Sequence, residues 1–306
     1  MDELFDVIII GAGAAGLSAG IYSSRARLST LILNEGVVGG QMVLTNEIAN
    51  YPGVELTHGY ALAGIMKKQA KAFGCKIKSN VKVIKYELEG EIKCITLEDG
   101  REFRSRSVIL SPGGKPRPLN IPGEESFKGS GISYCATCDG DFFTGKEIIV
   151  VGGGNSALEE AVTLTSYAKK VTIVHQFNHF QAFQHAIDEA AENPKIDFIM
   201  ESELRTFSGN GSLEEVSIEH LPSGNYSNLK INGVFVFVGY IPNTSHLQGM
   251  VELNERKEIV VDGNMRTNIP GVFAAGDCIV KKFRQVTTAV ADGTIASLSA
   301  AEFLRS

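Results

Sequence analysis

Two short apolar runs, each followed by a glycine-rich turn, organise the hydrophobic pattern of the chain. The first run is Val7–Ile10 before the turn Gly11–Gly16, and the second is Ile148–Val151 before the turn Gly152–Ala157. Each run consists of four consecutive β-branched residues, which is typical of a strand buried on both faces. The turns begin 141 residues apart, at positions 11 and 152, so the chain contains an internal repeat.

After each turn the pattern changes to a helical spacing and then returns to that of a strand. Helices are predicted over Leu17–Ser24 and Leu158–Tyr167, and strands over Leu31–Leu33 and Thr172–Val174. A strand, a glycine turn, a helix and a second strand form the opening of a dinucleotide-binding βαβ fold. The predicted fold class is therefore α/β, with two Rossmann-like dinucleotide-binding domains.

Two segments rich in turn-forming residues, Ser111–Pro118 and Val238–Asn243, predict the domain boundaries. We expect residues 1–115 to form the first part of one dinucleotide domain and residues 116–239 to form an inserted second domain. Residues 240–306 would then complete the first domain. A chain of 306 residues exceeds what one hydrophobic core usually organises, which agrees with two domains.

Hairpins are predicted beside both repeats. Short apolar alternations occur within Ile77–Leu110 and within Leu213–Phe237. Each contains a turn signal, Asp99-Gly100 in the first and Ser223-Gly224 in the second. Hairpins are therefore expected on each domain.

Composition excludes several classes of protein. Hydrophobic residues make up 43% and charged residues 21% of the chain, ordinary values for a soluble globular protein. A formal net charge of -6 argues against nucleic-acid binding, because phosphate neutralisation needs a concentrated basic surface. No run approaches the ~20 apolar residues of a membrane span, and the acidic N-terminus does not resemble a signal peptide. Five irregularly spaced cysteines do not resemble a secreted disulfide framework, so we expect a cytoplasmic protein.

The glycines of the first turn have distinct expected roles. Gly11 permits the tight turn, Gly13 lets the backbone approach a pyrophosphate, and Gly16 allows the helix to pack closely on the strand. The pyrophosphate would face free N–H groups at the positive end of the helix. A single motif of this kind is weak evidence, but two in register, each after a β-branched run, predict dinucleotide binding much more strongly.

A pair of cysteines, Cys135 and Cys138, lies just ahead of the second repeat. Their spacing on a helical turn places both sulfurs on one face within disulfide distance, which favours a redox pair. Half of a zinc site is an alternative, but it would need a second ligand pair, and the other cysteines are single and scattered; mere packing is another. Asp139 is a candidate acid that would protonate a leaving thiolate, or else a turn-forming residue before Gly140.

The sequence Cys-Ala-Thr-Cys-Asp-Gly at Cys135–Gly140, ahead of a glycine-rich βαβ unit, resembles that of the low-molecular-weight thioredoxin reductases. Matches to that family run through nearly the whole chain. They include Gly39–Gln41, Asn50–Gly53, Gly239–Thr244, Gly271–Asp277 and Arg284–Gly293.

The resemblance implies an FAD cofactor and the residues that hold it. The glycine turn would receive the pyrophosphate, and Asn34 takes the place of the acidic residue that usually binds the adenosine ribose, with Glu35 adjacent. Gln41 and Asn50 would line the flavin, and Asp277 would lie on the ribityl or phosphate side. The complete set of expected cofactor-binding residues is Gly11, Gly13, Ala14, Ala15, Gly16, Asn34, Glu35, Gly40, Gln41, Asn50, Gly113, Gly276, Asp277, Arg284, Gln285 and Val286.

The resemblance also implies the roles of the cysteines. Cys138 would face the flavin and Cys135 would attack the disulfide of thioredoxin, the protein substrate. The family is homodimeric, and its two domains rotate to present the cysteine pair alternately to flavin and to thioredoxin.

The chain departs from the family where NADPH is usually bound. Family members that use NADPH carry a His-Arg-Arg-x-x-x-Arg block whose arginines hold the 2′-phosphate by bidentate hydrogen bonds. The aligned residues here are His175–Gln181, without an arginine, and no arginine occurs anywhere from Pro118 to Leu204. An NAD-binding site would instead carry an acidic residue at this strand end, and His175 is not acidic.

Several explanations of this departure stay open. The sharpest is that ferredoxin, or a similar low-potential carrier, supplies the electrons, as in the ferredoxin-dependent flavin thioredoxin reductases that this pattern resembles. An NAD(P)H-dependent enzyme with an atypical ribose pocket is a second possibility. A catalytically idle relic and a non-enzymatic, flavin-bound redox sensor are further alternatives.

An acidic ferredoxin would dock on basic surface near the flavin. Lys281, Lys282 and Arg284 are the first candidates, and Arg25 with Arg27 form a second pair. An ordinary solvated charge run is the alternative reading of these residues.

Overall fold

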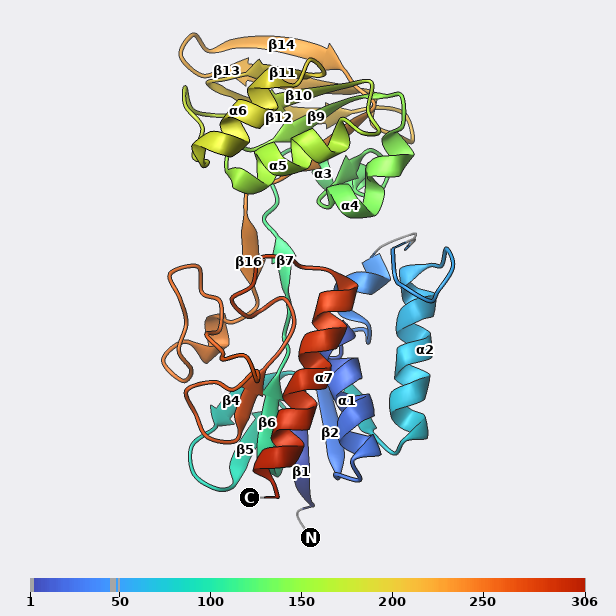
Figure 1. Cartoon of the computed structure of the whole chain (residues 1–306), viewed down its shortest axis with the longest axis vertical. Helices are drawn as coiled ribbons and strands as arrows, with labels where there is room; N and C mark the ends of the chain where they lie inside the picture. Colours follow the sequence, from blue (N-terminus) through green and yellow to red (C-terminus); the bar gives the residue numbers. More distant parts are fainter. Residues whose placement is uncertain (1–2, 45–47, 49, 306) are drawn as a thin grey trace. The chain divides into compact units, whose positions relative to one another are not determined.

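The computed structural model describes residues 3–44, 48 and 50–305, and the chain divides into two compact units (Figure 1). One unit combines residues 1–115 with residues 241–306, and the other comprises residues 116–240. The confirmed fold class is α/β, because each unit contains a parallel Rossmann-like sheet with helices packed on it. Within the described part of the chain, no helix is long and apolar enough to cross a membrane.

The first unit is built on a seven-stranded sheet with the order β3-β2-β1-β6-β5-β4, and β17 pairs with the last residues of β6, beyond those that pair with β5. The β1, β2, β3, β6 and β17 strands are parallel, whereas β4, β5 and β6 form the predicted antiparallel hairpins. The strands are β1 (Leu4–Ile10), β2 (Thr30–Asn34), β3 (Lys76–Ser79), β4 (Val83–Glu87), β5 (Lys93–Leu97), β6 (Glu102–Leu110) and β17 (Val272–Ala274).

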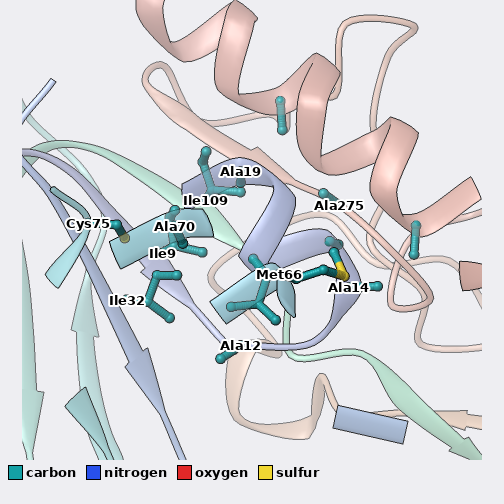
Figure 2. Close-up of a cluster of buried hydrophobic side chains, with 14 of the residues drawn as sticks. Ile9, Ala12, Ala14, Ala19, Ile32, Met66, Ala70, Cys75, Ile109 and Ala275 are labelled. Atoms are coloured by element: carbon teal, nitrogen blue, oxygen red, sulfur yellow. The ribbon is translucent and has the colours of Figure 1, made fainter. Parts of the chain in front are cut away.

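The apolar run of β1 is buried on both sides because its side chains alternate between two cores. Val7 and Ile9 point into a cluster with the helices, and Ile8 and Ile10 point into a cluster on the opposite face. Figure 2 shows Ile9 of the helix-side core among side chains of several elements, with Cys75 at its edge. Burial raises the pKa of the Cys75 thiol to about 12, so this cysteine behaves as a core residue.

Three helices cover that face: α1 (Ala14–Arg25), α2 (Gly59–Ala72) and α7 (Val286–Phe303). The α1 and α7 helices run side by side (Figure 1) and approach closely because small residues line their contact. A Cβ atom on Gly293 would lie 2.1 Å from the carbonyl oxygen of Ala15. Hydroxyl groups bridge the same helices, with 2.8 Å between the Oγ atoms of Ser23 and Ser297. Short 3₁₀ segments are η1 (Gly40–Leu44) and η3 (Ser245–Leu247).

The second unit has three layers around a parallel sheet with the order β11-β10-β9-β15-β8. Alternate residues of β9 face the two sides, with Ile148 and Val150 against the helices and Ile149 and Val151 against a three-stranded antiparallel sheet. The parallel strands are β8 (Ile132–Ser133), β9 (Glu147–Val151), β10 (Lys170–Val174), β11 (Ile196–Ile199) and β15 (Gly233–Val236). The antiparallel strands are β12 (Ser202–Ser208), β13 (Glu215–His220) and β14 (Asn225–Lys230).

The helices of the second unit are short. The helix predicted over Leu158–Tyr167 is α5 (Asn155–Leu164), which ends three residues earlier, where the Thr165 hydroxyl donates to the carbonyl oxygen of Val162. The remaining elements are α3 (Glu124–Phe127), α4 (Ala136–Asp139), η2 (Gly140–Phe143) and α6 (Gln184–Glu192). The predicted turn at Ser223-Gly224 is confirmed, since it joins β13 to β14.

The segments that join the units are themselves paired. β7 (Gly114–Pro116) and β16 (Tyr240–Pro242) form a two-stranded sheet. Both lie in the breaker-rich stretches that the sequence marks as boundaries.

Candidate cofactor site and redox disulfide

The first glycine turn brings the β1 strand and the α1 helix into close contact with the end of β6. Gly11 has a φ of +100°, and a Cβ atom there would lie 2.3 Å from the carbonyl oxygen of Ser111. A Cβ atom on Gly16 would lie 1.9 Å from the carbonyl oxygen of Gly11. Both positions therefore require glycine, as the pattern predicts.

Beyond the turn, the α1 helix presents its N-terminus without a side-chain cap. Gly13 is the N-cap residue, and no side-chain hydrogen bond caps the helix there. Gly40 faces it so closely that a Cβ atom on Gly40 would lie 3.1 Å from the Cα atom of Gly13. Uncapped N–H groups beside two facing glycines form a cradle for an anionic group such as a pyrophosphate.

Asn34, at the end of β2, holds this turn with its side chain. Its Oδ1 atom accepts a hydrogen bond of 2.8 Å from the N–H of Ala12, and its Nδ2 atom donates to the carbonyl oxygen of Gly36 at 2.9 Å. Asn34 is buried, whereas Glu35 is exposed. An amide suits this position because it can accept a hydrogen bond from one backbone group of the turn and donate to another.

Asp277 follows β17 and carries an unsatisfied polar atom. Its Oδ1 atom is buried and has no hydrogen-bond partner among the described residues. Burial raises the pKa of Asp277, whereas Lys281 and Arg284 act in the opposite direction. A buried carboxylate oxygen without a partner is costly in a folded protein, so it indicates a ligand that donates a hydrogen bond. The cradle and this atom fit a dinucleotide such as FAD.

The remaining expected cofactor residues lie in the same unit. Gly276 is packed on α1, since a Cβ atom there would lie 2.8 Å from the Cβ atom of Ala15. Asn50 donates to Gln285 at 3.3 Å, and Gln285 is the N-cap of α7, whose first residue is Val286. Gln41 is exposed on η1, and Gly113 has a φ of +64° with open space beside it.

Two of the basic residues expected on a docking surface form ion pairs within the unit, which leaves them less available to a partner. Lys281 Nζ lies 2.5 Å from Asp292 Oδ2, and both side chains are about nine-tenths buried. Arg284, whose side chain is 22% exposed, forms an ion pair with the buried Glu258. Sequence proximity in a charged run does not reveal that packing turns these cations inward. Lys282 is exposed, with its Nζ atom 5.2 Å from the ring centroid of Phe283.

In the second unit, Cys135 and Cys138 form a disulfide with Cα atoms 5.3 Å apart. Cys135 is the N-cap of α4 and has an extended backbone, and Cys138 lies in the helix. A disulfide occupies both sulfurs, which removes the zinc alternative for the oxidised protein. Both side chains are half-buried, as an exchange-competent pair requires.

Asp139 is tied to the disulfide through Ser133, the last residue of β8. Ser133 Oγ lies 2.6 Å from Asp139 Oδ2, and the N–H of Cys135 donates to the same hydroxyl at 3.1 Å. Burial raises the pKa of Asp139, although the hydrogen bond from Ser133 lowers it. No side-chain hydrogen bond from Asp139 caps the following η2 helix, so its carboxyl group is not acting as a turn cap.

The second glycine turn is packed against aromatic rings. Gly153 leaves room for the buried His175 ring, whose atoms lie 2.4 Å from where a Cβ atom would stand. The His175 ring stacks on Phe180 at 5.6 Å between centroids and meets Phe177 edge-on at 5.4 Å. The N–H of Gln181 donates to the carbonyl oxygen of Gly153 at 2.7 Å, which ties the segment to the turn.

This aromatic segment, residues 175–183, carries no lysine or arginine. Burial lowers the pKa of His175, so its ring is neutral at pH 7. Phe177 and Phe183 are 39% and 66% exposed, so apolar rings face solvent from the segment aligned with the expected clamp for a 2′-phosphate. The segment offers no charge to such a phosphate.

Sequence reasoning did not assign roles to Ser133 and Asp292. Ser133 lies two residues before the first cysteine, and Asp292 lies within the matched segment that ends at Gly293. Asp292 accepts a hydrogen bond from the N–H of Gly276 at 3.2 Å besides its pair with Lys281. In the sequence, these two residues are marked only by their position beside the cysteine pair and inside the matched segment Arg284–Gly293.

Comparison with known proteins agrees with this geometry. The model of the pyridine nucleotide-disulphide oxidoreductase family matches residues 5–293. A thioredoxin reductase of Peptoclostridium acidaminophilum is 43% identical over 99% of this chain and 98% of its own length. A 34.2 kDa protein in the rubredoxin operon of Clostridium pasteurianum is 42% identical over 99% of this chain and 98% of its own length.

A solved structure shows the same likeness. Thioredoxin reductase from Streptococcus pyogenes has a TM-score of 0.93 at 40% identity, covering 100% of this chain and 99% of that one. The family model and the curated relatives span nearly the whole of this chain, so the resemblance found in its motifs is confirmed. The chain therefore belongs to the pyridine nucleotide-disulphide oxidoreductase family, in its thioredoxin reductase branch, and is an FAD-dependent disulfide oxidoreductase.

Proposed function

We propose that this protein reduces the disulfide of thioredoxin through Cys135 and Cys138, with electrons from ferredoxin or a similar low-potential carrier rather than from NADPH. The observation that carries the choice of donor is the aromatic segment 175–183. It packs on the second glycine turn and presents neutral and apolar side chains where a 2′-phosphate needs cations.

The substrate follows from the relatives and from the disulfide. Two of the compared proteins are named thioredoxin reductases, and they resemble this chain over nearly its whole length. In the proposed cycle, the thiolate of Cys135 attacks the thioredoxin disulfide, and Cys138 then displaces the reduced product. Asp139 would supply the proton to the leaving thiolate, since burial favours its protonated form.

The first unit would hold FAD. The glycine turn and the N-terminus of α1 would bind its pyrophosphate, and the Oδ1 atom of Asp277 would accept a hydrogen bond from a hydroxyl group of FAD. Gln41, Asn50 and Gln285 would line the flavin. When bound, FAD supplies a carrier that takes up electrons singly and releases them as a pair.

An acidic donor would dock on exposed basic surface near the flavin. Docking would use Lys282, which is exposed beside the expected flavin segment, whereas the exposed Arg25 and Arg27 lie at the end of α1 opposite the glycine turn. Lys282→Glu should then slow reduction by ferredoxin at low ionic strength and leave disulfide exchange with thioredoxin unchanged.

A specific observation supports a second candidate, an NAD(P)H-dependent enzyme with an atypical ribose pocket. The second turn retains its glycine geometry, because Gly152 has a φ of +137° and a Cβ atom there would lie 2.4 Å from the carbonyl oxygen of Phe237. Gly154 begins α5 without a side-chain cap. A pyrophosphate could therefore still be received even though the cation clamp is missing.

Anaerobic titration separates the two donors. Reduced ferredoxin should bleach the visible absorbance of the bound flavin rapidly, whereas NADPH and NADH at micromolar concentration should not. Rapid bleaching by either nicotinamide would contradict the proposal. The variant Gln176→Arg/Phe177→Arg/Gln181→Arg should gain a response to NADPH above that to NADH, and its alanine counterpart Gln176→Ala/Phe177→Ala/Gln181→Ala should gain none.

We also propose a cytoplasmic homodimer, as in the family that the sequence resembles. The α2 helix exposes Tyr60 and Ile65, at 66% and 49%, which is apolar surface that a second copy could cover. Sedimentation at equilibrium measures the mass of the particle directly, and a monomer at micromolar concentration would contradict the dimer.

A further inference from the structure

Ser133 occupies a central position beside the redox disulfide. It is the last residue of β8 and only 4% exposed. Its Oγ atom lies 2.6 Å from Asp139 Oδ2, 3.1 Å from the N atom of Cys135 and 3.3 Å from the carbonyl oxygen of Cys135. One buried hydroxyl therefore contacts the acid and both backbone groups of the first cysteine.

The Ser133 hydroxyl can form two hydrogen-bond arrangements, one for each protonation state of Asp139. A serine hydroxyl has one hydrogen to donate and two lone pairs to accept with, and the N–H of Cys135 occupies one lone pair. When Asp139 is ionised, the hydroxyl must donate to it, because a carboxylate only accepts. When Asp139 is protonated, its O–H donates to the hydroxyl, whose own hydrogen then turns to the carbonyl oxygen of Cys135.

We infer that Ser133 is a positioning residue that keeps Asp139 bonded in both of its protonation states and links each state to the backbone at Cys135. The inference rests on the proposed role of Asp139 as proton donor. It extends that role by naming the group that holds the carboxyl in place while its proton leaves and returns.

The other groups around Asp139 do not favour its ionised form. Burial and the neighbouring carboxylate Asp141 raise the pKa of Asp139, and the hydrogen bond from Ser133 lowers it. The α5 helix packs against α4 and adds two further acids, Glu159 and Glu160, but no cation. Among the described residues, Ser133 is therefore the group that favours the ionised form of Asp139.

The proton can be followed through one turnover. The Cys135 thiolate forms a bond to one thioredoxin sulfur as the thioredoxin disulfide breaks, and the leaving thiolate takes the proton of Asp139. The Asp139 carboxylate then removes the proton of the Cys138 thiol. The Cys138 thiolate attacks Cys135, restores the protein disulfide and releases the second thioredoxin sulfur as a thiolate, so two electrons pass to thioredoxin.

The test uses the FAD-loaded full chain, reduced chemically with dithionite so that the physiological donor plays no part. Single-turnover reduction of oxidised thioredoxin is followed from mildly acidic to mildly alkaline pH. Loss of a donor to the carboxylate raises the pKa of Asp139, so Ser133→Ala should keep the acid protonated to higher pH. The alkaline limb of the rate profile should move up by about one pH unit, and Ser133→Thr should restore it.

The role of Asp139 is tested in the same series. Asp139→Asn should abolish the alkaline limb, and Ser133→Ala/Asp139→Asn should then behave like Asp139→Asn alone. A uniform loss of rate in Ser133→Ala with an unmoved limb would overturn the inference and leave the proposed acid intact. An unchanged profile in Asp139→Asn would instead overturn the role of Asp139 itself, and with it the inference.

Discussion

The two glycine turns of this chain share a sequence pattern, yet their surroundings differ at one pair of equivalent positions. In the first unit, Asn34 reaches back to the residue after the first glycine and accepts a hydrogen bond from the N–H of Ala12. In the second, His175 occupies the position of Asn34 and packs its ring on Gly153, the equivalent of Ala12. His175 lies 141 residues after Asn34, and Gly153 lies 141 residues after Ala12, which is the offset of the repeat.

This difference between Asn34 and His175 changes the space beside each glycine turn. A small amide leaves the first turn open beside its uncapped helix, where Gly40 and the Oδ1 atom of Asp277 provide ligand-binding geometry. A ring fills the space beside the second turn and anchors an aromatic segment that lacks cations. The first turn is therefore open beside its uncapped helix N-terminus, whereas the second is filled by a ring and followed by a segment without lysine or arginine.

The largest effect should come from Gly16→Ala. Its Cβ atom would stand 1.9 Å from the carbonyl oxygen of Gly11, so the turn must move, at a cost of about 3 kcal/mol in the free energy of unfolding together with loss of FAD. Gly64→Ala is the matched control, since Gly64 also lies in a helix but has no atom within 4 Å of the Cβ position. The control should be neutral or stabilised by roughly 0.5–1 kcal/mol. Chemical denaturation and flavin content measure both, and equal behaviour of the two variants would contradict the steric argument.

Gly153→Ala tests the second turn and should cost about 1–3 kcal/mol, because its Cβ atom would stand 2.4 Å from the His175 ring. Gly153→Ala/His175→Asn recreates the pair found in the first turn and should recover most of that loss. Hydrogen–deuterium exchange of peptides from residues 116–240 reports the stability of this unit. A double variant as unstable as the sum of the two single variants would show that the positions are not coupled.

Asn34→Ala should cost about 1–2 kcal/mol, because it leaves the buried N–H of Ala12 without its partner. The first unit should also bind FAD more weakly, whereas peptides of the second unit should exchange as before. Asn34→Asp is the control that keeps an acceptor for the same N–H. Weaker FAD binding in Asn34→Ala without a loss of stability would point to a direct contact with the cofactor instead.

The smallest effect is a pH dependence confined to the second unit. Burial lowers the pKa of His175 in the folded protein, so the unfolded chain takes up a proton at higher pH than the folded one. The contribution of His175 to stability is present above its unfolded pKa and is lost as the pH falls through its folded pKa. His175→Asn should remove this acid sensitivity, which thermal unfolding measured at mildly acidic and neutral pH would reveal. An identical dependence in wild type and variant would assign it to other groups.

Local sequence patterns predicted the helices, strands and turns better than the contacts that their side chains make. The β-branched runs, the glycine spacing and the hairpin turns all predict elements that the structure contains, because each depends on a few neighbouring residues. The charged run at Lys281–Arg284 does not reveal that two of its cations form ion pairs with Asp292 and Glu258, residues that lie outside the run. The contact between Ser133 and Asp139 spans six residues but depends on where β8 ends beside α4, which periodicity does not report.

The amino-acid sequence by itself determined the two βαβ units, the cysteine pair and the absence of arginine from the aromatic segment, residues 175–183. These follow from residue type and spacing, which act over short stretches of chain. Only the tertiary structure decided which polar atoms stay unpaired, which cations are buried, and that a histidine ring fills the second turn. Those outcomes depend on side chains brought together from distant positions, where close packing leaves room for one arrangement and excludes the others.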